Sequence, residues 1–200
     1  MDIENQVSMK NLVYVVLVAL LFTACQNHDY SPKPRGYFRI EFPQKNYQEY
    51  TGGCPFTFEY PTYARVVPDT ERITKPCWLN MQFPQFKGTL HISYEDIPSK
   101  AIFDSLVEHS HIFAFKHTIK ASSIDEMKLY YPEKKVYGVY YMIDGNAASS
   151  AQFFLTDSTK HFLRAALYFR TEPRLDSIQP VLTFIKKDMD VMIKTFKWKH

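Results

Sequence analysis

The sequence DSIQPVLTFIKKDMDVMIKTF, residues 176–196, decides the fold of this chain. Asp176 or Ser177 can cap the start of a helix, and apolar residues then recur at spacings of three and four. Lysines occupy the other side of this predicted helix. The apolar stripe consists of Ile178, Val181, Leu182, Ile185, Met189, Met192, Ile193 and Phe196. A helix with one apolar side must bury it, most simply on the face of a β-sheet.

The segments before this helix can supply the sheet. Prolines interrupt the chain between Tyr37 and Asp96, so we expect only short strands there, at residues 56–60, 64–67, 78–83 and 89–94. Apolar runs and period-two alternation then favour buried strands at residues 136–143, 151–156 and 161–170. The sequence Asp-Ser-Thr-Lys at 157–160 predicts a hairpin turn between the last two strands.

A helix is also expected between these two groups of strands, from Ser99 to about Ile119. The residues that recur there at helical spacing and would form its buried side are Ile102, Leu106 and Phe113, with the neighbouring Phe103 and Val107. Asp104 and Glu108 would lie on the other side. The order of strands, helix, three strands and packing helix predicts an α+β fold, with a largely antiparallel sheet packed by two main helices.

The N-terminal segment has the pattern of a secretory signal. Leu21-Phe-Thr-Ala-Cys25 closes an apolar run that begins at Leu12 and follows Lys10. A positive flank, a short apolar core and small residues before a cleavage point are typical of a signal peptide. The run is shorter than the roughly 20 residues that a transmembrane helix needs. A cysteine after the cleavage point indicates a bacterial lipobox, in which the thiol takes a diacylglyceryl group and the freed amine is acylated, with palmitate as the expected chain.

This pattern predicts three parts of the chain. Residues 1–24 would be the signal peptide, 25–36 a proline-containing tether lipidated at Cys25, and 37–200 a single globular α+β domain. Because Asp2 and Glu4 make the extreme N-terminus acidic, Met9 is an alternative start. The mature protein would face the periplasm from a membrane of the cell envelope, and the sequence leaves both the inner and the outer membrane open.

The remaining cysteines suit that oxidising compartment. The chain has three cysteines, and with Cys25 assigned to lipid, Cys54 and Cys77 form an even pair. We expect a structural disulfide between them. The alternatives are a redox pair, which usually shows C-x-x-C, and a zinc site, which needs further ligands at close spacing.

Composition and charge exclude some classes of partner. The chain is 46% apolar and 22% charged, which suits one well-formed core rather than a disordered polyelectrolyte. Its net charge is +3, and residues 1–24 contribute −1 through Asp2, Glu4 and Lys10, so the mature chain carries +4. Nucleic acid is not expected as a partner, because the protein is exported and has no run of Lys and Arg.

No motif in the sequence specifies a reaction. His109 and His111 point to different sides of a helix, and His117 lies two turns beyond His109, so we expect no metal site and no cofactor. Ser149 and Ser150 follow a stretch of small residues that could suggest a nucleophile turn, but no oxyanion motif accompanies them. The chain is therefore expected not to be an enzyme and to have no small-molecule substrate, with a serine hydrolase as the weaker alternative.

Tyrosines offer a second functional hypothesis. The chain has 14 Tyr and 16 Phe, and several tyrosines lie in polar, proline-rich surroundings where they could line a binding surface for a glycan or a peptide. These candidates are Tyr37, Tyr47, Tyr50, Tyr60 and Tyr63. The simpler alternative is packing of amphipathic tyrosines with their hydroxyl groups in water.

Several stretches resemble one known family. They begin with Pro-Arg-Gly-Tyr-Phe-Arg-Ile at 34–40, Gly-Cys-Pro-Phe at 53–56 and Cys-Trp-Leu-Asn at 77–80. Gly-Asn-Ala-Ala-Ser-Ser-Ala-Gln-Phe at 145–153, Leu-Tyr-Phe at 167–169 and Asp-Ser-Ile at 176–178 follow. Together they resemble the gliding motility lipoprotein GldD family of Bacteroidota, over the whole mature chain.

That resemblance implies a function for the chain. It implies a lipid-anchored accessory or scaffold protein of the cell envelope that supports gliding motility and the associated type IX secretion machinery. Other envelope proteins of that machinery would be its partners. Of the family's features, Cys25 matches the lipid site, and Cys54 and Cys77 match cysteine positions. The layout of strands and helices also resembles the Mog1/PsbP-like sandwich at the level of the fold.

Overall fold

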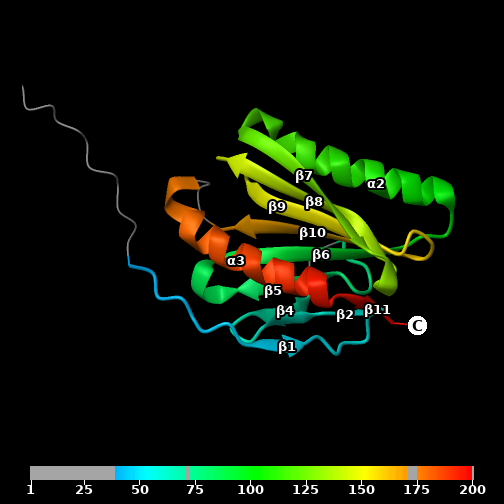
Figure 1. Ribbon diagram of the computed structural model, residues 1–200, viewed down its shortest axis with the longest axis horizontal. Helices are drawn as coiled ribbons and strands as arrows, with labels where there is room; N and C mark the ends of the chain where they lie inside the picture. The colour runs from blue at the N-terminus through cyan, green and yellow to red at the C-terminus, as the bar shows by residue number, and fades with distance from the viewer. Residues whose placement is uncertain (1–38, 71–72, 171–174, 200) are drawn as a thin grey trace, which may run out of the picture. The chain divides into compact units, whose positions relative to one another are not determined.

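A seven-stranded antiparallel sheet forms the centre of the fold (Figure 1). The computed structural model describes residues 39–70, 73–170 and 175–199. The strands lie in the order β4-β5-β6-β10-β9-β8-β7, and every neighbouring pair is antiparallel. Their bounds are Arg65–Pro68 (β4), Leu79–Phe83 (β5), Gly88–Asp96 (β6), Ala121–Tyr131 (β7), Val136–Gly145 (β8), Ser149–Thr156 (β9) and His161–Phe169 (β10).

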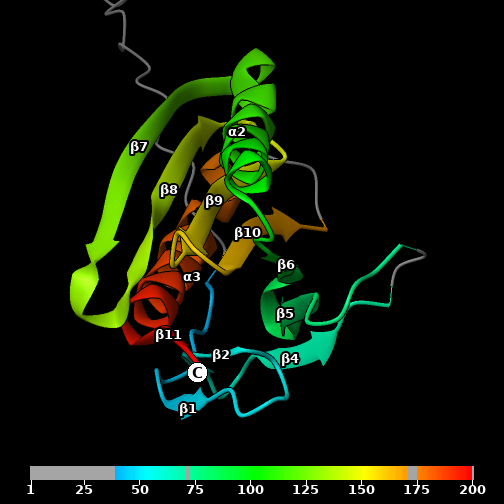
Figure 2. The ribbon, with the colours of Figure 1, turned by 90° about the vertical axis from the view of Figure 1, so that its right-hand side faces the viewer.

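Two α-helices of the described chain, α2 (Lys100–Phe115) and α3 (Leu175–Thr195), lie on opposite faces of this sheet (Figure 2). The alternation of side chains along the central strand β10 separates two cores. Leu163 and Leu167 are fully buried on the α3 side, whereas Phe162 packs with Ala114 of α2 on the other side. The predicted α+β class, with a largely antiparallel sheet and two main helices, is confirmed.

The apolar stripe of α3 is buried against the sheet, as its spacing in the sequence predicts. Its buried members pack onto the sheet together with large side chains of β5, β6, β9 and β10. They are Leu182, Ile185, Met189, Met192, Ile193 and, directly after the helix, Phe196, each at most 3% exposed. This face therefore holds the main core, whose burial provides most of the stabilisation that the helix needs.

Short strands flank α3 and the sheet. β1 (Tyr47–Glu49) pairs with β3 (Glu59–Pro61), and β2 (Phe56–Thr57) pairs with the C-terminal strand β11 (Lys197–Trp198). The backbone N–H of Glu59 donates to the Thr195 hydroxyl at the end of α3. Single turns of 3-10 helix, η1 (Pro84–Phe86) and η3 (Pro132–Lys134), connect β5 to β6 and β7 to β8, and η2 (Lys116–Ile119) follows α2.

The structure corrects two expectations from the sequence. The buried side predicted for α2 was wrong in part, because Ile102 and Phe113 are 44% and 42% exposed, and the buried residues of that helix are Ser110 and Ala114. The strand β7 was not predicted at all. It is an edge strand with one residue, Leu129, fully buried, so its sequence lacks the apolar alternation of a core strand.

Candidate functional site

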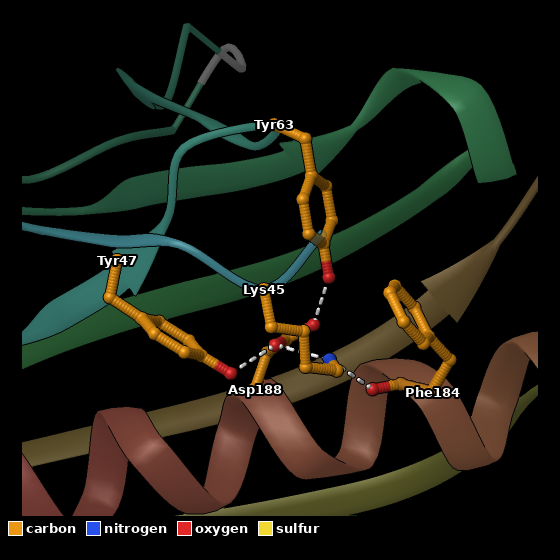
Figure 3. A network of polar contacts seen from close by, with 5 residues as sticks. All are labelled: Lys45, Tyr47, Tyr63, Phe184 and Asp188. Carbon is orange, nitrogen blue, oxygen red and sulfur yellow. Dashed lines mark hydrogen bonds and ion pairs between the residues drawn. The ribbon is translucent and has the colours of Figure 1, made fainter. Parts of the chain in front are cut away.

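Two of the tyrosines proposed as a binding surface meet at a buried carboxylate. Asp188 of α3 is 1% exposed, and the hydroxyl groups of Tyr47 and Tyr63 both donate hydrogen bonds to it, that of Tyr47 at 2.8 Å (Figure 3). Burial, followed by the hydrogen bond to Asp188 and its negative charge, raises the pKa of both tyrosines above the ordinary value. Both hydroxyls therefore stay protonated as donors.

A lysine completes this cluster. The Lys45 ammonium lies 2.6 Å from Asp188 Oδ1 and also donates to the Phe184 carbonyl oxygen at 2.9 Å (Figure 3). The same ammonium lies 3.6 Å from the centre of the Phe184 ring, on which Tyr63 stacks. The cluster supplies the hydrogen bonds and the positive charge that a buried carboxylate requires, so its role is to fasten the N-terminal strands to α3.

The other candidate tyrosines pack separately. Tyr50 stacks on Phe58 with ring centres 5.1 Å apart, and Tyr60 contacts Phe58 edge-on. Tyr37 lies outside the described residues. None of the four described tyrosines lines either of the two cavities that flank α2. The tyrosine surface stays a prediction, and each of these side chains has a structural partner.

The expected disulfide is present. Cys54 and Cys77 are bridged, with Cα atoms 5.5 Å apart. The bridge ties the segment before β2 to the segment that leads into β5, and the Tyr50 hydroxyl contacts Cys54 Sγ at 3.3 Å. Cys25, the predicted lipidation site, and the predicted signal and tether at 1–36 lie outside the described residues.

The serines of the hydrolase alternative are buried in the sheet. Ser149 and Ser150 begin the buried strand β9 and are 0% and 2% exposed. The Ser149 hydroxyl donates to the Ala151 carbonyl oxygen at 3.3 Å. A nucleophile needs a base within hydrogen-bond reach and an opening for substrate, and these two buried hydroxyls line neither of the larger cavities.

The histidines of α2 and η2 are dispersed. His111 stacks on Phe115 and faces Glu126 of β7 at 3.6 Å, whereas His109 lines a cavity on the other side of the helix. Burial, and then the nearby charge of Arg164, lowers the pKa of His117. Across residues 39–70, 73–170 and 175–199, no group of three or more His, Cys, Asp or Glu side chains could hold a metal ion.

Two cavities flank α2 on its face of the sheet. One of about 680 Å³ lies toward β7, β8 and β9 and is lined by Phe103, Val107, Glu126 and Tyr130, among others. The other, of about 450 Å³, lies toward β5, β6 and β10. We call it the Arg164 cavity, and its lining includes Trp78, Asn80, Leu106, His109, Phe113, Phe162 and Arg164. Both cavities exist because α2 covers only the middle of this face of the seven-stranded sheet (Figure 2).

Sequence reasoning missed the two charged residues that organise these regions. Asp188 lies inside the apolar stripe of α3, between Ile185 and Met189, and Arg164 lies on the central strand β10. A charge at a buried position was the available signal, since charged side chains are almost never buried without a partner. The partners, Lys45 for Asp188 and Gln152 for Arg164, come from other elements and were not visible in the pattern.

Comparison with known proteins now gives the family. A family model described as gliding motility lipoprotein GldD matches residues 27–198. The chain belongs to the GldD family. The resemblance seen in the sequence is thereby confirmed, and membership supports a lipoprotein of the cell envelope with a role in gliding. No helix of the described residues is long and apolar enough to cross a bilayer.

Other comparisons add little to the GldD assignment. The chain is similar to the solution structure of cyanobacterial PsbP, CyanoP, from Synechocystis. That match has 12% sequence identity and a TM-score of 0.48, and it covers 84% of this chain and 99% of the other. No curated protein matches the chain.

Proposed function

We propose that this chain is a non-enzymatic accessory protein that is anchored by lipid at Cys25 and faces the periplasm. In this role it supports the gliding machinery and the type IX secretion system associated with it. The observation that carries the proposal is the match of residues 27–198 to the gliding motility lipoprotein family. The lipobox at Leu21–Cys25 supplies the attachment, because three acyl chains hold a protein at a bilayer far more firmly than one.

The chemistry of the described residues supports a role without catalysis. Two buried polar groups have a structural use: Ser149 bonds to Ala151, and Asp188 anchors Lys45, Tyr47 and Tyr63. Asp157, at the end of β9, accepts from three backbone N–H groups of the following turn. These are the uses of polar side chains in a scaffold rather than in an active site.

Complementation of a gliding-defective deletion strain tests this proposal. The wild-type gene should restore gliding, and the Cys25→Ala variant should not, although the protein is still made. The matched variants Ser149→Ala and Ser150→Ala remove the hydroxyl groups that a serine hydrolase would use as nucleophiles. Both variants should restore gliding fully. Loss of gliding in a serine variant that is present at the wild-type level would contradict the non-enzymatic role, and full rescue by Cys25→Ala would contradict the anchor.

A further inference from the structure

The Arg164 cavity contains a cation whose charge is only partly compensated. The guanidinium of Arg164 donates to Gln152 Oε1 at 2.5 Å and hydrogen-bonds to Tyr168, while its Nε is buried without a partner. Within the described part of the chain, no carboxylate forms an ion pair with it. A half-buried guanidinium with a buried Nε and no carboxylate partner is a strong candidate to bind an anion.

The acidic residues of the same cavity do not supply that anion. Glu95 accepts two bonds from Lys75, at 2.7 and 2.9 Å, and Asp69 accepts a bond from the Asn80 amide at 3.1 Å. Neither carboxylate forms an ion pair with Arg164 among the described residues. The positive charge at the α2 side of the cavity is therefore left for a ligand.

A second cation and a histidine lie at the α2 side. The Phe113 ring lies 4.7 Å from the guanidinium carbon of Arg164 and 4.7 Å from the Lys116 ammonium. His109 lines the cavity next to Phe113. This end of the cavity thus combines positive charge with an aromatic surface.

The remaining walls are apolar. Trp78, Leu106 and Phe162 line the cavity, whose volume of about 450 Å³ lies in the range of sites for small ligands or single side chains. A bare phosphate ion would leave these walls uncovered. A ligand that places an apolar group between them and an anion against Arg164 would satisfy both features.

We infer that the Arg164 cavity binds a carboxylate that is attached to an aromatic or bulky apolar group, the chemistry found at the C-terminus of a peptide that ends in such a residue. The planar guanidinium matches a planar carboxylate, and the apolar walls accept the neighbouring side chain. The site would give an accessory protein a way to hold a chain end. The inference stands on the cavity alone, so it can fail without affecting the lipid anchor or the gliding role.

Fluorine NMR of the mature lipoprotein in detergent micelles tests the inference. The chain has two tryptophans, and 5-fluorotryptophan labels both. Trp78 lines the cavity, whereas Trp198 packs against Phe196 and serves as the internal reference. N-acetylphenylalanine should shift the Trp78 signal saturably and leave the Trp198 signal in place. N-acetylphenylalaninamide, which lacks the carboxylate, should shift neither signal at the same concentrations.

Variants and competing probes complete the test. Arg164→Gln should weaken binding of N-acetylphenylalanine at least tenfold, whereas Arg170→Gln, an exposed arginine just beyond the same strand, should not change it. If Arg164→Gln fails to fold, the comparison of acid with amide on the wild-type protein decides alone.

Tighter binding of acetyl-Ala-Ala-Phe than of N-acetylphenylalanine would support a peptide end as the source, and equal binding would support a small carboxylate. Equal shifts by acid and amide, full competition by inorganic phosphate, or no shift at all would overturn the inference.

Discussion

Lys45 and Asp188 lie 143 positions apart in the sequence, and their ammonium and carboxylate groups meet at 2.6 Å. The carboxylate is 1% exposed and the lysine side chain 25% exposed. The two residues join the segment before β1 to the middle of α3 (Figure 3). This contact ties the first described segment of the chain to the last helix.

Removing the buried charge should weaken the fold. Asp188→Asn leaves Lys45 beside an uncharged amide and gives Tyr47 and Tyr63 a poorer acceptor, so we expect it to lower the free energy of unfolding by about 3 kcal/mol. The measurement is urea denaturation followed by circular dichroism. Asp190→Asn is the matched control, because Asp190 lies on the exposed side of the same helix. That substitution should be neutral or slightly stabilising, and equal losses for both variants would contradict the role of Asp188.

Sequence periodicity could predict the layers but not the long-range polar contacts. The stripe from Leu182 to Phe196 identified α3 and its buried face, because a helix on a sheet must show that period. For α2 the same rule placed Ile102 and Phe113 inward, although the helix rests on the sheet through Ser110 and Ala114. Small residues let a helix approach a sheet closely, and hydrophobic periodicity does not record them. The Arg164 cavity could not be predicted from the sequence either, because its lining comes from β5, β6, α2 and β10.

The disulfide should contribute measurably to stability. The bridged cysteines are 23 positions apart, for which chain entropy predicts a stabilisation of about 3 kcal/mol. Replacement of both Cys54 and Cys77 by alanine should lower the free energy of unfolding by about that amount. A reducing agent should destabilise the wild-type protein and leave the double variant unchanged. An unchanged wild-type unfolding curve after complete reduction would contradict this prediction.

The hairpin turn between β9 and β10 should make stability depend on pH. Burial tends to raise the pKa of Asp157, but hydrogen bonds from the N–H groups of His161, Lys160 and Thr159 and from the Thr159 hydroxyl outweigh it, so the pKa lies below its ordinary value. The unfolded chain therefore takes up this proton first as the pH falls. The stabilisation by Asp157 is fully present above the unfolded pKa of about 4 and is lost as the pH falls through the folded value.

Comparison with a neutral variant isolates that contribution. Asp157→Asn should be less stable than the wild-type protein at pH 7, because an amide is a weaker acceptor for the turn. The difference in unfolding free energy should shrink between about pH 4 and pH 2. A difference that is constant over this range would show that ionisation of Asp157 does not stabilise the turn.

A glycine in β8 should not tolerate a side chain. A Cβ atom at Gly138 would overlap the carbonyl oxygen of Phe154 on the neighbouring strand β9, and a backbone atom cannot move aside easily. Gly138→Ala should therefore lower the free energy of unfolding by about 2–4 kcal/mol. Gly53 has no atom within 4 Å of the same position, so Gly53→Ala should change stability by less than about 0.5 kcal/mol. Equal effects of the two alanines in thermal unfolding would refute the steric argument.

The proposed anchored role requires above all a lipid at the mature N-terminus. The direct measurement is mass spectrometry of the native protein recovered from the membrane fraction of the cells that make it. The expected result is a chain that begins at Cys25, with a diacylglyceryl group in thioether linkage and an acyl group on the α-amine. A native chain that retains residues before Cys25, or that carries a free thiol there, would contradict the account.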